Sequence, residues 1–292
     1  MKISGAMIIR NGVKLGYPFI ESVRSILPFC FEVIVAVGKS DDDTRAKIEA
    51  IESPKIRIVD TIWDMHQRSG GTVLSQQTNI AMGHCAGDWI FYIQGDEIAD
   101  VRSIDAVNAA LALAADDRRI DGIAFRYVHF YGSYYTIQTG RNWYDSEVRI
   151  VRNHAGITSH GDAQGFRRHG AKVRALLCSA SIYHYGWARP PQIMADKIRS
   201  FHALWHNDLW IEQNCGGLKL EEYFTDLGNI AQFTEDHPLP ILPSVNREFE
   251  PFILRCRENY IKRRTWKQRL IDLSRRLPLG KHRNYELVKE LK

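Results

Sequence analysis

The chain has 292 residues, of which 45% are hydrophobic and 25% are charged, and its net charge at pH 7 is +5. This balance is typical of a globular protein with a sizeable core, and the length fits one α/β domain with a C-terminal appendage. No run of 18 apolar residues occurs, so we expect no transmembrane helix, and the N-terminal stretch 1–10 is too short and too soon charged for a signal peptide. Five dispersed cysteines exclude a zinc motif and predict reduced thiols in a cytoplasmic protein.

The first hundred residues alternate strand and helix patterns. Apolar runs predict strands over 3–9, 32–37, 55–60 and 89–93, and amphipathic stretches predict helices over 19–27, 41–51 and 74–85. Continuous apolar strands alternating with helices indicate a mostly parallel sheet with helices on both faces. Ligands of such sheets bind beyond the carboxyl ends of the strands, where Asn11, the acids 41–43 and Asp96 fall.

Beyond residue 100 the pattern changes. We expect a helix over 104–115, strands over 122–131, 147–152 and 178–185, a helix from Pro190-Pro191 to about 207, and a loop-rich segment over 214–247. Residues 1–210 would form the main domain, and 211–292 a loop-rich segment with a helical tail. The aromatic side chains between the strands are candidates for a sugar-stacking wall, with core packing as the alternative; they are Tyr131, Tyr134, Tyr135, Trp143 and Tyr144.

An acidic turn, Gln94-Gly95-Asp96-Glu97, directly follows the apolar strand 89–93. Carboxylate oxygens at a strand end suit Mg²⁺ or Mn²⁺, which keep coordination positions for water and phosphate. A solvated turn is the alternative interpretation.

Two blocks of sequence resemble glycosyltransferase family 2. Residues 33–44 (VIVAVGKSDDDT) are similar to a hydrophobic run followed by D-x-G-S-x-D-x-T, and residues 87–97 (GDWIFYIQGDE), preceded by Asn79, are similar to the segment GDWxLxLDADE. The blocks have the family's order and a spacing of roughly fifty residues. Later blocks at 147–153, 161–164 and 183–187 resemble the branch that includes lipopolysaccharide-core glucosyltransferases.

This resemblance, which covers about residues 3 to 205, implies a GT-A (Rossmann-like) fold. It also implies an inverting glycosyltransferase that uses Mn²⁺ or Mg²⁺ to neutralise the leaving diphosphate. Residues 1–100 would bind the nucleotide and 101–210 the acceptor.

The implied site residues fall into three groups. The metal ligands would be Asp96, Glu97 and His184, and the catalytic base would be Asp162, with Glu147 as the alternate. The donor-binding residues would be Arg10, Asn11, Ser40, Asp42, Asn79, Gln94 and Arg167. Arg168 and Arg189 are further candidates for phosphate contacts. Ordinary structural roles stay open for His184, for Asp162 and for the arginines.

The chain departs from the family pattern at two positions. Gln94 replaces the first acid of the DxD motif, so Asp96 would carry most of the protein charge at the metal. The Asp with which the family recognises its nucleobase falls near Val37 or Gly38, positions that hold no acid here, so a uracil preference does not carry over.

Residues 255–283 contain eleven Lys and Arg against two acids, a local charge of +9 that leaves −4 for the rest of the chain. Ile261, Trp266, Leu270, Leu273 and Leu277 fit one helical face, which predicts a basic amphipathic helix on an anionic membrane surface. A solvated surface helix is the alternative.

The leading prediction is therefore a metal-dependent glycosyltransferase for a cell-surface glycan or glycolipid, cytoplasmic or peripheral on the inner face of the membrane. A nucleotidyltransferase is the alternative enzyme, although no Gly-rich loop follows the first strand. A non-catalytic protein that binds nucleotide-sugar or nucleic acid is the alternative outside enzymes; nucleic acid is the less expected partner.

Overall fold

The computed structural model describes residues 1–64, 69–203, 205–215, 217–275 and 283–291. Within them, no helix combines the length and the apolar character that a membrane span requires. The five cysteines are buried, free thiols.

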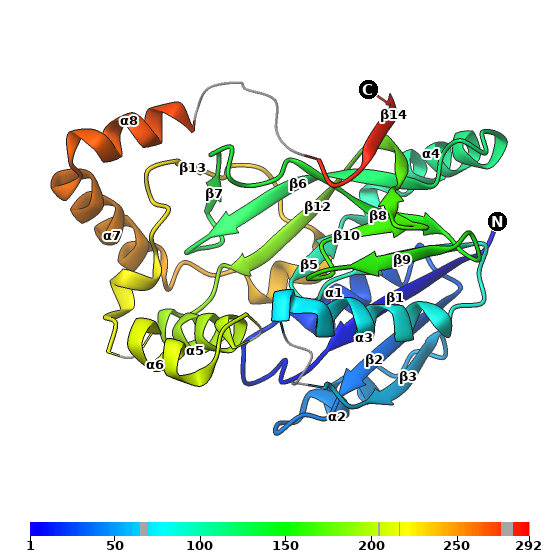
Figure 1. Ribbon diagram of the computed structural model, residues 1–292, viewed down its shortest axis with the longest axis horizontal. Helices are drawn as coiled ribbons and strands as arrows, with labels where there is room; N and C mark the ends of the chain where they lie inside the picture. The colour runs from blue at the N-terminus through cyan, green and yellow to red at the C-terminus, as the bar shows by residue number, and fades with distance from the viewer. Residues whose placement is uncertain (65–68, 204, 216, 276–282, 292) are drawn as a thin grey trace.

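The N-terminal part alternates strands and helices as predicted (Figure 1). Its elements are β1 (Ile3–Ile9), α1 (Phe19–Ile26), β2 (Glu32–Gly38), α2 (Thr44–Glu49), β3 (Ile56–Thr61), α3 (Thr72–Gly83) and β4 (Trp89–Ile93). β1 pairs in parallel with β2 and β4, and β2 pairs in parallel with β3. The carboxyl ends of these four strands therefore lie at one edge of the sheet.

The second part of the sheet is mixed. Its elements are β5 (Glu97–Ala99), α4 (Ile104–Asp116), β6 (Gly122–Tyr131), β7 (Thr136–Gln138), β8 (Ser146–Arg152), β9 (Ile157–His160), β10 (Gly165–Arg168), β11 (Ala171–Lys172) and β12 (Arg174–Trp187). β8 lies antiparallel between β4 and β6, so the order is β13 (Ile230–Gln232), β7, β6, β8, β4, β1, β2 and β3, while β12 runs parallel to β6. Strands β9–β11 form a separate small sheet that the sequence did not predict.

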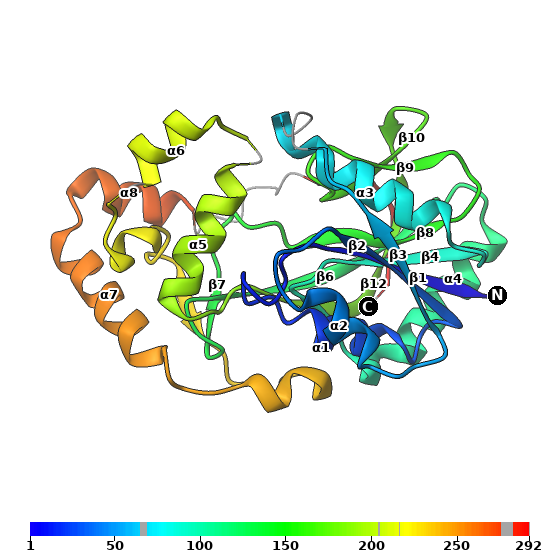
Figure 2. The ribbon, with the colours of Figure 1, turned by 90° about the horizontal axis from the view of Figure 1, so that it is seen from below.

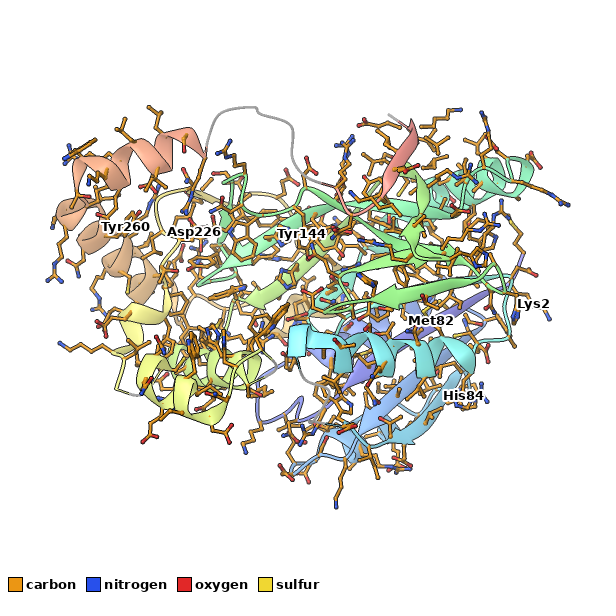
Figure 3. All side chains as sticks on the ribbon, viewed as in Figure 1. Lys2, Met82, His84, Tyr144, Asp226 and Tyr260 are labelled. Atoms are coloured by element: carbon orange, nitrogen blue, oxygen red, sulfur yellow. The ribbon has the colours of Figure 1, made fainter. Side chains whose placement is uncertain are left out.

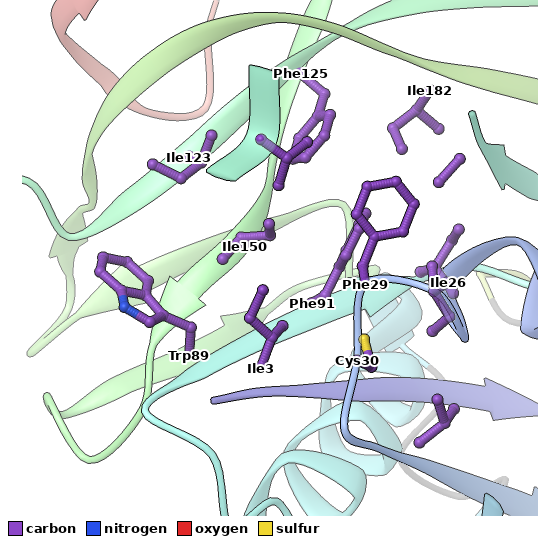
Figure 4. Packing of buried hydrophobic residues seen from close by; sticks show 14 of the residues in the cluster. Ile3, Ile26, Phe29, Cys30, Trp89, Phe91, Ile123, Phe125, Ile150 and Ile182 are labelled. Carbon is purple, nitrogen blue, oxygen red and sulfur yellow. The ribbon is translucent and has the colours of Figure 1, made fainter. Parts of the chain in front are cut away.

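Helices cover both faces of the central sheet. Apolar side chains of α1 and α4 pack on one face and those of α3 on the other, and Figure 2 shows α1 and α3 on opposite sides. In the first layer Phe91 stacks on Phe125 at 5.4 Å and meets Phe29 edge-on at 5.6 Å between ring centroids (Figure 4). The predicted α/β class, with a central sheet flanked by helices, is confirmed.

The C-terminal part is mostly helical; its helices gather at one end of the molecule, whereas its last strand lies apart from them, beside the central sheet (Figures 1 and 2). It contains α5 (Pro191–His202), α6 (Asp208–Cys215), β13 (Ile230–Gln232), α7 (Glu250–Arg263), α8 (Trp266–Ser274) and β14 (Glu286–Glu290), with short 3₁₀ turns between them. Polar contacts tie these segments together: Asp226 accepts hydrogen bonds from Trp143 Nε1 at 2.9 Å and from Arg275 Nη1 at 3.2 Å. Figure 3 labels Asp226 and Tyr260 in this part.

The basic tail differs from the prediction of one continuous helical face. α7 ends at Arg263, and Thr265 caps a new helix because its side chain accepts a hydrogen bond from Gln268 N at 3.3 Å. After α8 the chain returns to the sheet, where β14 pairs in parallel with β12. Leu277, part of the predicted face, lies outside the described residues.

Candidate active site

A pocket of about 720 Å³ opens at the carboxyl ends of β1 and β4, a volume typical of small-molecule sites. The predicted residues that line it are Arg10, Asn11, Gln94, Asp96, Asp162 and His184. The aromatic side chains that line it are Tyr17, Trp63, Tyr92, Trp143, Tyr144, Trp187 and Phe201. On one side it is closed by α5, which contributes Lys197.

Asp96 lies at the end of β4 and is held by two cations. Its Oδ2 atom is 3.2 Å from Lys197 Nζ and 3.2 Å from Arg189 Nη2, and 3.7 Å from His184 Nε2. Burial acts to raise the pKa of Asp96, but Lys197, His184 and Arg189 outweigh it and hold the pKa well below the usual value. Asp96 is therefore a carboxylate at neutral pH.

The two cations are themselves fixed by the fold. Arg189 is buried, donates to Leu15 O and stacks on Tyr17, with 4.1 Å between the guanidinium carbon and the ring centroid. Lys197 donates to Gly186 O at 2.6 Å. Burial first, and then the neighbouring Arg189, lowers the pKa of Lys197 to about 7, while Asp96 acts in the opposite direction. Negative charge arriving in the pocket would therefore favour the charged form of Lys197.

Gly186 permits this arrangement because it has no side chain. A Cβ atom there would collide with His184 Nε2 and lie 2.8 Å from Asp96 Oδ2. The sequence Tyr183-His184-Tyr185-Gly186-Trp187 thus places an imidazole and a tight glycine together beside the acidic turn.

His184 belongs to a chain of hydrogen bonds. Its Nδ1 atom is 3.0 Å from Nδ1 of His129, whose Nε2 donates to Tyr144 O at 2.7 Å. Because a neutral His129 that donates from Nε2 accepts at Nδ1, His184 must donate from Nδ1.

Glu97 faces the core, although it is next to Asp96 in the sequence. Arg149 binds both of its oxygens, at 2.7 Å and 2.9 Å, and neither side chain is exposed to solvent. Tyr127 Oη at 2.8 Å and Gln94 N at 3.1 Å donate to the same carboxylate. These four hydrogen bonds occupy both oxygens of Glu97 and leave no lone pair for a metal ion or a ligand.

Of the predicted donor-binding residues, Arg10, Asn11 and Gln94 line the pocket. Ser40 and Asp42 instead support the loop after β1. Ser40 Oγ accepts from Asn11 N at 3.0 Å, and Asp42 Oδ2 accepts from Lys14 N at 2.7 Å. Their polar groups shape the loop that carries Asn11.

Asn79 and Arg167 also make structural contacts away from the pocket lining. Asn79 exchanges two hydrogen bonds with the backbone of Ser159, at 2.8 Å and 3.2 Å, which joins α3 to β9. Arg167 Nη1 donates to Asn284 O at 3.2 Å, and neighbouring Arg168 pairs with Asp121 at 2.6 Å. Neither Asn79 nor Arg167 lines the pocket, and the phosphate contacts predicted for Arg167 and Arg168 stay predictions.

Asp162, the predicted base, reaches the pocket from the loop between β9 and β10. Its Oδ1 atom accepts from Gln164 N at 3.3 Å, and Gln94 Nε2 donates to Ala163 O at 3.4 Å. The loop that bears Asp162 is thus joined to the turn that bears Asp96. The alternate base, Glu147, lies in the core, where it accepts from Gln164 Nε2 at 3.2 Å and Asn284 Nδ2 at 3.0 Å.

The predicted aromatic wall divides between pocket and core. Trp143 and Tyr144 line the pocket, and Figure 3 shows Tyr144 near the middle of the molecule. Tyr131 is buried in a cluster with the C-terminal helices, Tyr134 packs in another cluster, and Tyr135 stacks under Arg247 at 3.8 Å.

Sequence reasoning assigned no role to Lys197 or Trp63. Lys197 lies within a helix whose local sequence does not distinguish it from a surface lysine. The indole of Trp63 fits beside Gly38, where a Cβ atom would lie 2.7 Å from Trp63 Cδ1. In the sequence, only the glycine at position 38, which leaves room for the indole, indicates this contact.

The side chains around Asp96 do not fit a resident divalent cation well. Among the described residues, no three His, Cys, Asp or Glu come together as a metal-holding group. Gln94 brings no charge, Glu97 is bound by Arg149, and Asp96 already faces two cations. Mn²⁺ or Mg²⁺ binding stays a prediction, and the side chains around Asp96 argue against it.

No family model and no curated protein matches the chain. Among solved structures it is similar to S. aureus TarS 1-349, with 13% identity, a TM-score of 0.40, and coverage of 77% of this chain and 70% of that one. The same TarS fragment in complex with UDP-GlcNAc gives 14% identity and a TM-score of 0.41 over 90% and 81% of the two chains. Glucosyl-3-phosphoglycerate synthase from Mycobacterium tuberculosis, with Mn²⁺, UDP and phosphoglyceric acid, gives 21% identity and a TM-score of 0.30 over 44% of this chain and 43% of that one. At this low level of similarity, the activities of these proteins are not evidence for the activity of this chain.

Proposed function

We propose that this protein is a GT-A glycosyltransferase that moves a sugar from a nucleoside-diphosphate donor to a glycan or glycolipid acceptor. The observation that carries the proposal is the position of Asp96 and Lys197 in one pocket at the carboxyl ends of parallel strands, with Arg189 paired to Asp96 from behind. Open α/β sheets bind nucleotides at this edge, and the cations offer charge for phosphate groups. The two family 2 sequence blocks end at this edge, which supports the same assignment.

The pocket offers different chemistry along its length. Trp63 and Arg10, with 5.9 Å between the guanidinium carbon and the ring centroid, provide a flat surface for a nucleobase near the ends of β1 and β2. Trp143 and Tyr144 provide rings on which the C–H faces of sugars pack. The diphosphate would lie between these regions, toward Lys197.

Asp162 would serve as the base. In an inverting transfer, the acceptor oxygen forms a bond to the anomeric carbon as the bond from that carbon to the diphosphate oxygen breaks. The bonding pair leaves with the diphosphate, and the acceptor proton passes to the Asp162 carboxylate. Stereochemistry follows the family resemblance and is part of the proposal.

The test is a panel of UDP-, GDP-, CMP- and dTDP-sugars, with binding followed by thermal shift and turnover followed by release of nucleotide. We expect one class of donor to bind and to be hydrolysed slowly, and Asp96→Ala to abolish both. A nucleotidyltransferase would instead release pyrophosphate from a nucleoside triphosphate and a sugar phosphate. Binding without any turnover would favour a non-catalytic protein.

We also propose that α8 brings the enzyme to an anionic membrane surface, where lipid-linked acceptors would be found. Trp266 and Leu270 expose 67% and 56% of their surface, and Lys267 and Arg269 on the same short helix are exposed. The acid of this helix, Asp272, is buried against Tyr260 and is not on the surface. Apolar and basic side chains together favour contact with anionic lipid.

A further inference from the structure

The charge around Asp96 is already positive without an added ion. The single carboxylate faces both Lys197 and Arg189 at 3.2 Å; Arg189 is buried, and the Lys197 side chain is 12% exposed. A divalent cation bound to Asp96 would add two positive charges beside these groups in a site that water screens poorly. Displacing the two side chains would leave them without the acceptor that now holds them.

The two cations retain unused hydrogen-bond donors. Lys197 has acceptors for two of its three N–H groups, Asp96 Oδ2 and Gly186 O. Arg189 Nε is also buried without an acceptor among the described residues, but Arg189 does not line the pocket, so this N–H is not a site for a pocket ligand. The free N–H of Lys197 does face the pocket, and it favours an anion there over a further cation.

We infer that Lys197 and Arg189 take the place of a divalent cation and neutralise the donor diphosphate directly. The inference rests on the proposed glycosyltransferase function and names the groups that bind the leaving diphosphate. Lys197 lines the pocket and would contact the phosphate oxygens, while Arg189 stays fixed by Leu15 O and Tyr17 and adds charge from behind Asp96. Asp96 is then a positioning residue that orients both cations.

The test is titration calorimetry on the full chain with UDP, GDP, dTDP and inorganic pyrophosphate, each in EDTA and in Mn²⁺. We expect at least one nucleoside diphosphate to bind equally well in both buffers. Lys197→Met should weaken that binding by about tenfold or more, because a charge-assisted hydrogen bond is lost. Lys197→Arg should restore part of the affinity.

Lys47→Met is the matched control, because Lys47 is exposed on α2 and does not line the pocket. It should leave the affinity unchanged. The wild-type comparison of EDTA with Mn²⁺ stands even if Lys197→Met fails to fold.

Nucleotide binding that disappears in EDTA and returns with Mn²⁺ would overturn the inference and leave the glycosyltransferase proposal intact. Absence of binding to every nucleotide in both buffers would overturn the proposed function, and the inference with it.

Discussion

Asp96 and Glu97 are consecutive carboxylates that face two different regions, the pocket and the core beneath it. Glu97 is enclosed: Arg149 binds it through two hydrogen bonds, and Tyr127 and Gln94 N complete its surroundings. Asp96 lies at the pocket, and Lys197, one of the two cations that bind it, keeps one N–H without an acceptor there among the described residues. The hydrogen bonds of Glu97 and its partners are all made within the protein, so this ion pair stabilises the fold. Asp96 has a partner with a free N–H at the pocket, so this ion pair can also bind a ligand.

The opposite facing of the two acids separates effects on stability from effects on function. It follows from the strand pairing, because β5 begins at Glu97, and the Glu97 side chain enters the layer occupied by Tyr127 and Arg149. The Asp96 side chain, one residue earlier, turns toward α5. Substitutions on the pocket side should change rates, and substitutions on the core side should change the free energy of unfolding.

The largest expected effect is on the pocket side, at the proposed base. Asp162→Asn should lower kcat by about 100- to 10,000-fold, because general-base catalysis contributes that range, while donor binding changes little. The measurement is steady-state turnover with the donor identified by the nucleotide-sugar panel. Asp105→Asn, on the exposed start of α4, is the control and should retain the wild-type rate.

A wild-type kcat in Asp162→Asn would remove Asp162 from the mechanism. A fall in kcat accompanied by an equal loss of stability would place Asp162 with the structural acids instead.

On the core side, Glu97→Gln should lower the free energy of unfolding by about 3–5 kcal/mol, because Arg149 would stay buried without its counter-charge. Urea denaturation measures this loss. Replacing both partners, Glu97→Met with Arg149→Met, should be less harmful than Glu97→Gln, since no unpaired charge remains.

If Glu97→Gln leaves stability unchanged but abolishes turnover, the contrast between the two acids fails. Glu97 would then belong to the site, as the acidic turn first predicted.

Much of the fold was predictable because strands β1–β4 are continuous apolar runs, and the period of such runs is a local property. The turn that bears Asp96 was predictable for the same reason. What could not be predicted depends on distant partners: Arg149 lies 52 residues from Glu97, and Lys197 lies 101 residues from Asp96. No local pattern shows which of two adjacent acids will meet which cation.

Short strands were also missed. β9 to β11 have between two and four residues each, too few for alternation to be recognised. β14 follows a basic segment and pairs with β12, so its partner, not its own sequence, makes it a strand.

Glu147 is a second buried acid on the core side, and it extends the comparison because, unlike Glu97, it has no arginine among the described residues bound to its carboxylate. Burial raises its pKa from an ordinary 4.5 to about 7, against the opposing effects of Arg149, Asn284 and Gln164. Since the folded-state pKa is the higher one, Glu147 costs no stability below about pH 4.5, and its contribution becomes destabilising as pH rises toward 7, by about 3 kcal/mol at most. Glu147→Gln should remove this dependence.

The measurement is urea denaturation of both proteins between about pH 5 and pH 8. We expect the free energy of unfolding of the variant to rise relative to that of the wild type as pH rises. If the two free energies change in parallel with pH, Glu147 does not titrate in this range.

The smallest expected effect concerns α8, a surface remote from both acids. Trp266→Ser with Leu270→Ser should reduce flotation with vesicles rich in phosphatidylglycerol, since both side chains are exposed and would enter the lipid interface. Each exposed Lys or Arg near such a surface adds about 1 kcal/mol, so binding should weaken as salt rises. Point substitutions are preferable to deletion of residues 255–292, because α7 buries Cys256 and β14 pairs with β12.

Leu113→Ser on α4 is the matched control, because Leu113 is another exposed leucine, 41% accessible, on a helix distant in sequence from the basic tail. It should float like the wild type, and vesicles of phosphatidylcholine alone should bind none of the proteins. Equal flotation of the α8 variant and the wild type would mean that these apolar side chains do not enter lipid. The pocket would then have to receive its acceptor without help from α8, while the contrast between Asp96 and Glu97 would be unaffected, because neither carboxylate contacts this helix.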